Sequence, residues 1–208
     1  MTSIQKLYDE WSATYDSVVN TTRDLEKRAC ESLLGQLSFD RVLELGGGTG
    51  KNTAWLAERS REVVSVDLSP EMLAIAHEKV KASNVEFRVG DVTREWDFGD
   101  GFDLITCSLI LEHVEDLGHV LREAARVLVP GGRFYICELH PFKQYGGTKA
   151  RFEGVGGEKV LECFTHHVSD YTNPALISGF AIERMDEWFD GYDRSALPRL
   201  ASFVFKRA

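Results

Sequence analysis

The sequence predicts an α/β protein with a doubly wound, mostly parallel seven-stranded sheet, an antiparallel C-terminal edge and a small inserted β-flap. Between residues 38 and 138, short β-forming segments alternate with segments of helical apolar spacing, as in parallel sheets covered by helices on both faces. A glycine cluster follows the first of these strands, and an acid stands at the end of each of the next two. Because ligands of such folds bind at the carboxyl ends of the strands, the pattern also predicts a ligand site there.

Two helices are expected ahead of the sheet, in the region 1–37. Apolar and aromatic residues recur at helical spacing through residues 3–20 and again through residues 24–37. The first helix carries tyrosine and tryptophan on its apolar face. It is expected either to pack on the domain or to act as a lid over the glycine cluster.

The glycine cluster lies in residues 42–50, V-L-E-L-G-G-G-T-G, where an apolar strand runs into a turn and then a helix start. Glycine allows a sharp turn and a close ligand approach, and the free N–H groups of a helix start favour acceptors and negative charge. A dinucleotide fingerprint fails because its sixth position is Lys51, and a phosphate-binding P-loop fails at Leu45 and Asn52. A glycine-rich turn without a ligand remains the plain alternative for the motif taken alone.

The pattern that does fit is E-x-G-x-G-x-G, formed by Glu44, Gly46, Gly48 and Gly50. In this motif, and in the L-x-P-G-G segment before the strand at 133–138, the chain resembles the class I S-adenosylmethionine-dependent methyltransferases of quinone biosynthesis and secondary metabolism. The resemblance covers residues 38–138 well and the remainder in outline. It implies S-adenosylmethionine as cofactor, S-adenosylhomocysteine as product, and an N-terminal Tyr-Asp segment folded over the cofactor, with Tyr15 as the candidate.

Polar residues stand where the later strands end. Residues 62–67 form a β-branched strand ending on Asp67, about twenty residues past the glycines, where a ribose-binding carboxylate sits in doubly wound folds. The next strand ends at Asp91, where the resembled family has an acid that binds the adenine amino group. The strand 102–108 lacks polar alternation, so it should be buried on both faces, with Ser108 beside the cofactor's methionine part. The predicted cofactor-binding residues are Tyr15, Glu44, Gly46, Gly48, Gly50, Asp67, Leu68, Met72, Asp91, Val92 and Ser108.

The chain 1–208 is expected to be a single methyltransferase domain, with 38–138 as its cofactor-binding core. Glycine-rich turns between extended stretches predict an inserted β-hairpin in the segment 139–180, which would then form the substrate cap. Residues 181–208 are expected to supply the two final strands.

Methyl transfer needs positioning, exclusion of water and, where the acceptor carries a proton, a general base. The candidates for this base are Glu138, His140, His166, His167 and Tyr171. His140 is the predicted catalytic residue because it stands at the mouth of the fifth strand and histidine accepts a proton near neutral pH. The four cysteines form no C-x-x-C pair and no H-x-x-H spacing occurs, so no metal site is predicted.

Net charge and hydropathy limit the binding partners and the location that can be expected. The formal net charge of −9 argues against non-specific nucleic-acid binding, which needs a basic surface. No apolar run is long enough for a membrane span, and the first residues lack the apolar core of a signal peptide, so a cytoplasmic protein is expected. The edge of the flap allows either a monomer or a homodimer.

The leading hypothesis is methyl transfer from S-adenosylmethionine to a small, partly apolar acceptor. An NAD-dependent oxidoreductase is the second, and the missing sixth-position glycine argues against it. A non-catalytic, cofactor-binding partner subunit is the third, and the intact Glu44, Asp67 and Asp91 weigh against a dead site.

Overall fold

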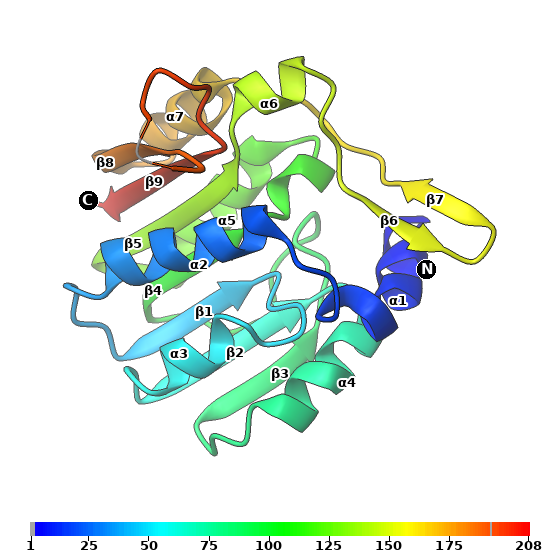
Figure 1. The fold of residues 1–208 in the computed structure, drawn as a ribbon. Coiled ribbons are helices and arrows are strands. Elements are labelled where there is room, and N and C mark those ends of the chain that lie inside the picture. The colour runs from blue at the N-terminus through cyan, green and yellow to red at the C-terminus, as the bar shows by residue number, and fades with distance from the viewer. Residues whose placement is uncertain (1–2, 192) are drawn as a thin grey trace.

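The computed structural model describes residues 3–191 and 193–208. A central sheet has helices on both faces, and a separate hairpin projects beside the N-terminal helix (Figure 1). The strands of the sheet are β1 (Arg41–Leu45), β2 (Glu62–Asp67), β3 (Val85–Val89), β4 (Phe102–Ser108), β5 (Leu128–Leu139), β8 (Phe180–Trp188) and β9 (Leu200–Arg207). The hairpin consists of β6 (Arg151–Gly154) and β7 (Gly157–Val160).

The helices are α1 (Ser3–Tyr15), α2 (Thr21–Leu34), α3 (Thr53–Ala57), α4 (Pro70–Lys79), α5 (Leu117–Val127), α6 (Pro141–Tyr145) and α7 (Val168–Ile177), with a 3-10 turn η1 (Leu111–His113). Among the described residues, none of these helices has the length and apolar character needed to cross a bilayer.

The strand order confirms the predicted fold class. The seven strands run β3-β2-β1-β4-β5-β9-β8. The first five pair in parallel, whereas β9 pairs antiparallel with both β5 and β8. Since β1 lies at the point where the order reverses, its carboxyl end opens onto the crevice in which doubly wound sheets bind ligands.

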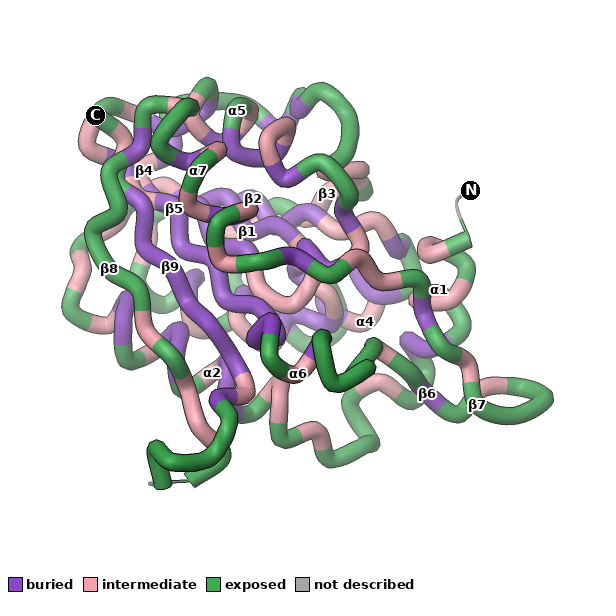
Figure 2. Tube along the Cα trace, turned by 90° about the horizontal axis from the view of Figure 1, so that it is seen from above, coloured by how far each residue is buried: buried purple, intermediate pink, exposed green. Residues whose placement is uncertain are grey.

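The apolar patterning explains the two core layers. One buried cluster lies on the face covered by α5 and α7, and the other on the face covered by α2 and α3. Central strands such as β1 and β4 are therefore apolar toward both faces, as parallel strands require. Figure 2 shows the central strands buried along most of their length, while the edge strand β8 is largely exposed.

Several predicted boundaries were wrong because capping side chains decide where a helix begins. The helix expected through residue 20 ends at Tyr15, and the helix expected from 24 begins at Thr21. Asn20 sets that start, since its side chain accepts hydrogen bonds from the backbone N–H groups of Thr22 and Arg23. Similarly, α7 begins at Val168, where the Asp170 carboxylate accepts the backbone N–H of His167 at 2.8 Å.

The N-terminal helix and the hairpin hold each other in place over one end of the sheet. The rings of Trp11 and Phe152 stack with centroids 5.0 Å apart and planes 10° from parallel. The Glu10 carboxylate also accepts the backbone N–H of Val155 at 2.9 Å. A stacked aromatic pair contributes about 0.5–1.5 kcal/mol beyond its buried area. Segments from distant parts of the sequence thereby form one cover (Figure 1).

Candidate functional site

The turn after β1 has a backbone that only glycine adopts easily. Gly46, Gly48 and Gly50 have φ angles of +73°, +54° and +81°. A Cβ on Gly46 would lie 2.3 Å from Ile110 Cγ2. The N–H groups of Gly46 and Gly47 both donate to the Val66 carbonyl, at 2.8 and 3.1 Å, which ties the turn to β2.

Glu44 fixes the base of this turn. Its buried Oε2 accepts hydrogen bonds from Thr53 Oγ1 at 2.5 Å and from Ser65 Oγ at 2.7 Å. These bonds join β1 to β2 and to the start of α3. Burial raises the pKa of Glu44 to about 7, although the two hydroxyl groups oppose the shift.

Asp67, at the end of β2, reaches back to the same turn. Its Oδ2 accepts the backbone N–H of Gly48 at 2.8 Å, and its Oδ1 accepts that of Ser69 at 2.9 Å. Burial raises the pKa of Asp67, and the backbone N–H groups hold the shift down. The carboxylate is therefore fixed in position at the rim of the crevice.

A cavity of about 230 Å³ opens above these strand ends. It brings together nine of the eleven predicted cofactor-binding residues, namely Tyr15, Gly46, Gly48, Asp67, Leu68, Met72, Asp91, Val92 and Ser108. Within it, Asp91 Oδ1 accepts hydrogen bonds from the Thr93 backbone N–H at 2.9 Å and the Thr93 hydroxyl at 2.6 Å.

The two remaining predicted residues lie elsewhere. Glu44 lines an adjoining recess of about 60 Å³, which shares Tyr15 and Ser108 with the cavity. Gly50 is among the lining residues of neither space, and a Cβ there would lie 2.9 Å from Val80 Cγ2 and 3.2 Å from Ala76 Cβ. The geometry thus gives Gly50 a packing role against the end of α4.

The adjoining recess holds a second buried carboxyl group that the sequence analysis missed. Glu26, on α2, accepts the Ser108 hydroxyl at 2.6 Å and the Asn52 side-chain amide at 3.0 and 3.2 Å. Burial raises its pKa. The only sequence signal was an acid beside inward-facing apolar residues, and its partner lies 82 positions away.

Arg23 lines the same recess. Its guanidinium lies 4.0 Å above the Tyr15 ring and donates to the carbonyls of Tyr15 at 2.7 Å and Val18 at 2.9 Å. Its Nε is buried without a hydrogen-bond partner among the described residues. This donor is therefore available to an acceptor placed in the recess.

Polar contacts hold α1 over the glycine turn. Asp16 accepts the Thr49 hydroxyl at 2.8 Å and pairs with Lys79 Nζ at 2.7 Å. The Ser69 hydroxyl donates to Asp9 at 2.6 Å. These bonds place Tyr15 against the cavity, as a covering segment would.

A further contact joins α1 to the turn after β4. The Tyr8 hydroxyl and His113 Nε2 lie 2.9 Å apart, and both residues line the cavity. Burial raises the pKa of Tyr8 well above its ordinary value. Local sequence patterns do not predict this pair, because the partners are 105 positions apart.

His140 is not where a general base is needed. It is 3% exposed, it is absent from the residues lining the cavity, and its Nδ1 accepts the backbone N–H of Phe142 at 3.2 Å as the N-cap of α6. Nε2 must then carry the proton, and it faces Glu187 Oε1 at 3.1 Å. Burial lowers the pKa of His140 against the opposing effect of Glu187. The expectation that His140 faces the methyl group is corrected by this arrangement.

Replacing His140 with alanine is accordingly expected to lower the free energy of unfolding by about 1–2 kcal/mol, through loss of a helix cap and of the hydrogen bond to Glu187. Urea denaturation measures this change. Unchanged stability together with a loss of methyl transfer would restore His140 to a catalytic role.

Three of the other base candidates are engaged in hydrogen bonds, and the fourth, Tyr171, is buried in the core with a hydroxyl that has no partner among the described residues. His166 Nε2 is buried within 3.1 Å of the Leu111 carbonyl and 2.8 Å of the Val114 carbonyl, and His167 Nδ1 lies 2.7 Å from the Tyr145 hydroxyl. Glu138 Oε1 accepts the backbone N–H groups of Ile110 and Leu111, both at 3.0 Å. Burial raises the pKa of Glu138 to about 8, and the neighbouring Glu112 carboxylate adds to the shift.

One group of potential metal ligands occurs among the described residues. Atoms of Glu112, His113 and Cys163 lie within 4.8 Å of one another. Both nitrogens of His113 already face partners, Tyr8 and the Glu162 carbonyl, and burial raises the pKa of the Cys163 thiol to about 12. As arranged, the nitrogens of His113 are already engaged in this cluster, and the absence of a metal stays a prediction.

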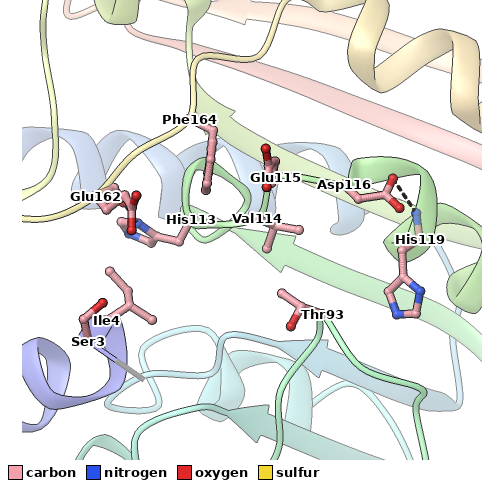
Figure 3. Close-up of a pocket in the computed structure, with 10 residues that line it drawn as sticks. All are labelled: Ser3, Ile4, Thr93, His113, Val114, Glu115, Asp116, His119, Glu162 and Phe164. Carbon is pink, nitrogen blue, oxygen red and sulfur yellow. Dashed lines mark hydrogen bonds between the residues drawn. The ribbon is translucent and has the colours of Figure 1, made fainter. Parts of the chain in front are cut away.

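A second, wider opening of about 470 Å³ adjoins the cavity (Figure 3). It shares Ile4, Thr93, His113 and Val114 with the cavity. Three carboxylates, Glu115, Asp116 and Glu162, give its wall an acidic character.

Comparison with known proteins agrees with this arrangement. The family described as "Methyltransferase domain" matches residues 43–136. The demethylmenaquinone methyltransferase of Tropheryma whipplei (strain Twist) is 35% identical over 147 residues, which are 66% of this chain and 60% of that protein. The ubiquinone biosynthesis O-methyltransferase of Xanthomonas oryzae pv. oryzae (strain PXO99A) is 33% identical over 152 residues, 69% of this chain and 61% of that protein. The chain thus spans about three fifths of these two relatives.

Solved structures agree in fold. An S-adenosylmethionine-dependent methyltransferase from Mesorhizobium loti superposes with a TM-score of 0.75 at 23% identity, covering 90% of this chain and 100% of that one. The DhpI-SAM-HEP complex gives a TM-score of 0.79 at 20% identity, with both chains fully covered. Residues 43–136 thus match the methyltransferase domain, and the chain has the fold of the S-adenosylmethionine-dependent methyltransferases with which it superposes.

Proposed function

We propose that the protein transfers a methyl group from S-adenosylmethionine to a small-molecule acceptor. The observation that carries this proposal is the cavity at the strand ends, where a glycine turn, a fixed carboxylate and a covering helix meet. The named relatives act in menaquinone and ubiquinone biosynthesis, which supports a small, partly apolar acceptor.

The residues present fit this cofactor. A Cβ on Gly48 would meet nothing within 4 Å, so the backbone there is open to a ligand. Asp67 is placed to accept hydrogen bonds from the ribose hydroxyls, and Asp91 from the adenine amino group. Leu68, Met72 and Val92 line the cavity and would pack against the adenine ring.

The recess beside the glycines suits the amino-acid end of the cofactor. Two buried carboxyl groups, Glu26 and Glu44, would face its ammonium group. The unpartnered Nε of Arg23 would donate to its carboxylate. A buried donor or acceptor without a partner costs about 1–3 kcal/mol, and a bound ligand relieves that cost.

When bound, S-adenosylmethionine supplies an electrophilic methyl group, so the chain need not provide a nucleophile. Its own residues position the acceptor and exclude water. Helix α1 covers the cofactor cavity. Tyr15 lines both this cavity and a second cavity that lies on the outer side of the helix. Orientation and desolvation of this kind contribute several kcal/mol to catalysis.

A thermal-shift measurement tests the cofactor assignment. At 100 times its dissociation constant, S-adenosylhomocysteine should stabilise the protein by about 2.7 kcal/mol, which raises the Tm by roughly 5–10 °C for a domain of this size. NAD at the same concentration should have no effect. Stabilisation by NAD alone would favour an oxidoreductase, and no response to either would contradict the proposed cofactor site.

The remaining proposals concern the acceptor-binding segment, the partners of the protein and its location in the cell. We infer that segment 139–180 forms the acceptor cap, because its hairpin packs on α1 beside the cavity. The net charge of −9 supports action on a small molecule without nucleic acid. A cytoplasmic monomer or homodimer is consistent with these features.

A further inference from the structure

A separate cavity of about 220 Å³ lies on the outer side of α1. Its walls come from α1, from the turn after β4, and from residues 148–151 ahead of and within β6. Tyr8, Tyr15 and Leu109 line both this space and the cofactor cavity. Tyr15 and Leu109 also border the adjoining recess, so a methyl group held between that recess and the cofactor cavity would lie beside this outer cavity.

Aromatic side chains form one wall of this outer cavity. Trp11 stacks near Tyr8 at 5.8 Å and meets Tyr15 edge-on at 4.9 Å. Leu109 and Leu139 add apolar surface. Flat apolar walls of this kind favour a planar, ring-containing ligand. An engineered cavity of about 150 Å³ holds benzene, so a space of this size accommodates one substituted ring.

The inner wall holds a carboxyl group, that of Glu112, with one oxygen that has no partner among the described residues. Glu112 is 7% exposed and lines the outer cavity, and its Oε2 has no hydrogen-bond partner among the described residues. Its backbone carbonyl accepts the N–H of Phe164 at 2.7 Å, which fixes the residue in place. Burial raises the pKa of Glu112, while His113 and the Cys163 thiol oppose the shift. A proton acceptor of raised pKa is well matched to general-base chemistry near neutral pH.

The rim of the outer cavity is basic, although the whole chain carries a net charge of −9. Three cations line it, Arg23, Lys149 and Arg151, against the single acid Glu112. Arg23 is committed to backbone carbonyls. Lys149 is exposed and has no ion pair within 4 Å among the described residues, and Arg151 has only an exposed contact of 3.8 Å with Glu158. Two cations are therefore available to a ligand.

We propose that the outer cavity takes the methyl acceptor, and that this acceptor is a single-ring aromatic anion with a hydroxyl or amine group. Lys149 and Arg151 bind its anionic group at the rim, and the Glu112 carboxylate receives the proton of its hydroxyl or amine. This inference rests on the proposed methyl transfer. The wider opening of Figure 3 has an acidic wall, so it is the wrong sign for such a ligand.

The reaction balances with the groups named. The acceptor oxygen or nitrogen forms a bond to the methyl carbon as the carbon–sulfur bond breaks. The electron pair of that bond remains on sulfur, which becomes the neutral thioether of S-adenosylhomocysteine. The proton leaves the acceptor for the Glu112 carboxylate, so the product leaves without an added charge.

Binding of defined probes to the protein saturated with S-adenosylhomocysteine tests the acceptor class. The three hydroxybenzoates and three aminobenzoates are compared with phenol, aniline and the cation benzylamine by calorimetry. At least one benzoate should bind 10-fold or more tightly than every uncharged or cationic probe. Lys149→Glu together with Arg151→Glu should remove that preference. Failure of every benzoate to bind, or preferential binding of benzylamine, would overturn the proposal.

A matched pair of variants tests Glu112. With the best benzoate and S-adenosylmethionine, Glu112→Gln should lower the rate of methyl transfer at least 100-fold and change the dissociation constant of the benzoate less than 3-fold. Glu115→Gln, an exposed neighbour outside the outer cavity, should leave both values unchanged. Equal rates in the two variants would remove Glu112 from catalysis.

The proposed function and the assignment of the acceptor can be contradicted independently of each other. A protein that does not bind S-adenosylhomocysteine contradicts the proposed function itself. A protein that binds S-adenosylhomocysteine but shows no preference for anionic rings contradicts only the assignment of the acceptor.

Discussion

Asp67→Ala is expected to weaken binding of S-adenosylhomocysteine at least 100-fold. The substitution removes a charged acceptor for two ribose hydroxyls, and hydrogen bonds to charged groups contribute about 1.5–3 kcal/mol each. It also frees the N–H groups of Gly48 and Ser69, which the carboxylate now holds at 2.8 and 2.9 Å. A loss of roughly 3–5 kcal/mol follows, and each 1.4 kcal/mol is tenfold in affinity. Isothermal titration calorimetry measures the dissociation constant directly.

Two controls separate the charge of Asp67 from its structural role. Asp97→Ala makes the same change of charge at an exposed position outside the cavity, so it should bind with wild-type affinity. Asp67→Asn keeps one oxygen acceptor and should fall between wild type and Asp67→Ala. Wild-type affinity in Asp67→Ala would contradict the ribose assignment.

Gly46→Ala is expected to lower the free energy of unfolding by about 2–5 kcal/mol. A side chain at its φ of +73° adds backbone strain of about 1–2 kcal/mol. Its Cβ would lie 2.3 Å from Ile110 Cγ2, and overpacking of this kind costs about 1–3 kcal/mol. Because Ile110 lines the cavity, cofactor affinity should fall as well. Urea denaturation with and without S-adenosylhomocysteine measures both effects.

Other glycines in the chain provide matched comparisons. Gly131 has a φ of +78° and open space around a Cβ, so Gly131→Ala should show the backbone strain alone. Gly48 has open space too, but it lines the cavity, so Gly48→Ala should weaken the ligand more than the fold. Equal destabilisation in Gly46→Ala and Gly131→Ala would mean that Ile110 yields without cost.

The sequence was sufficient for the sheet and for the strand-end residues, because both depend on local patterns. Apolar runs, glycines and terminal acids lie within a few positions of one another, and the parallel topology then brings them to one edge. Asp67 and Ser108 could therefore be placed at the rim in advance.

The missed residues are those whose partners lie far away in the chain. Glu26 and Ser108 are separated by 82 positions, and Tyr8 and His113 by 105. A local periodicity in the sequence cannot predict a contact between residues so far apart in the chain. His140 failed for a different reason, since a histidine before proline suits both a loop base and a helix cap, and only the packed position distinguishes them.

The stack of Trp11 on Phe152 ties helix α1 to the hairpin that carries Arg151, one of the residues lining the outer cavity. Helix α1 covers the cofactor cavity and also supplies Tyr8 and Tyr15 to the wall of the outer cavity. The binding space for the acceptor is therefore complete only while the helix is seated. We therefore expect a compulsory order of binding. S-adenosylmethionine binds before the acceptor, and S-adenosylhomocysteine leaves after the methylated product.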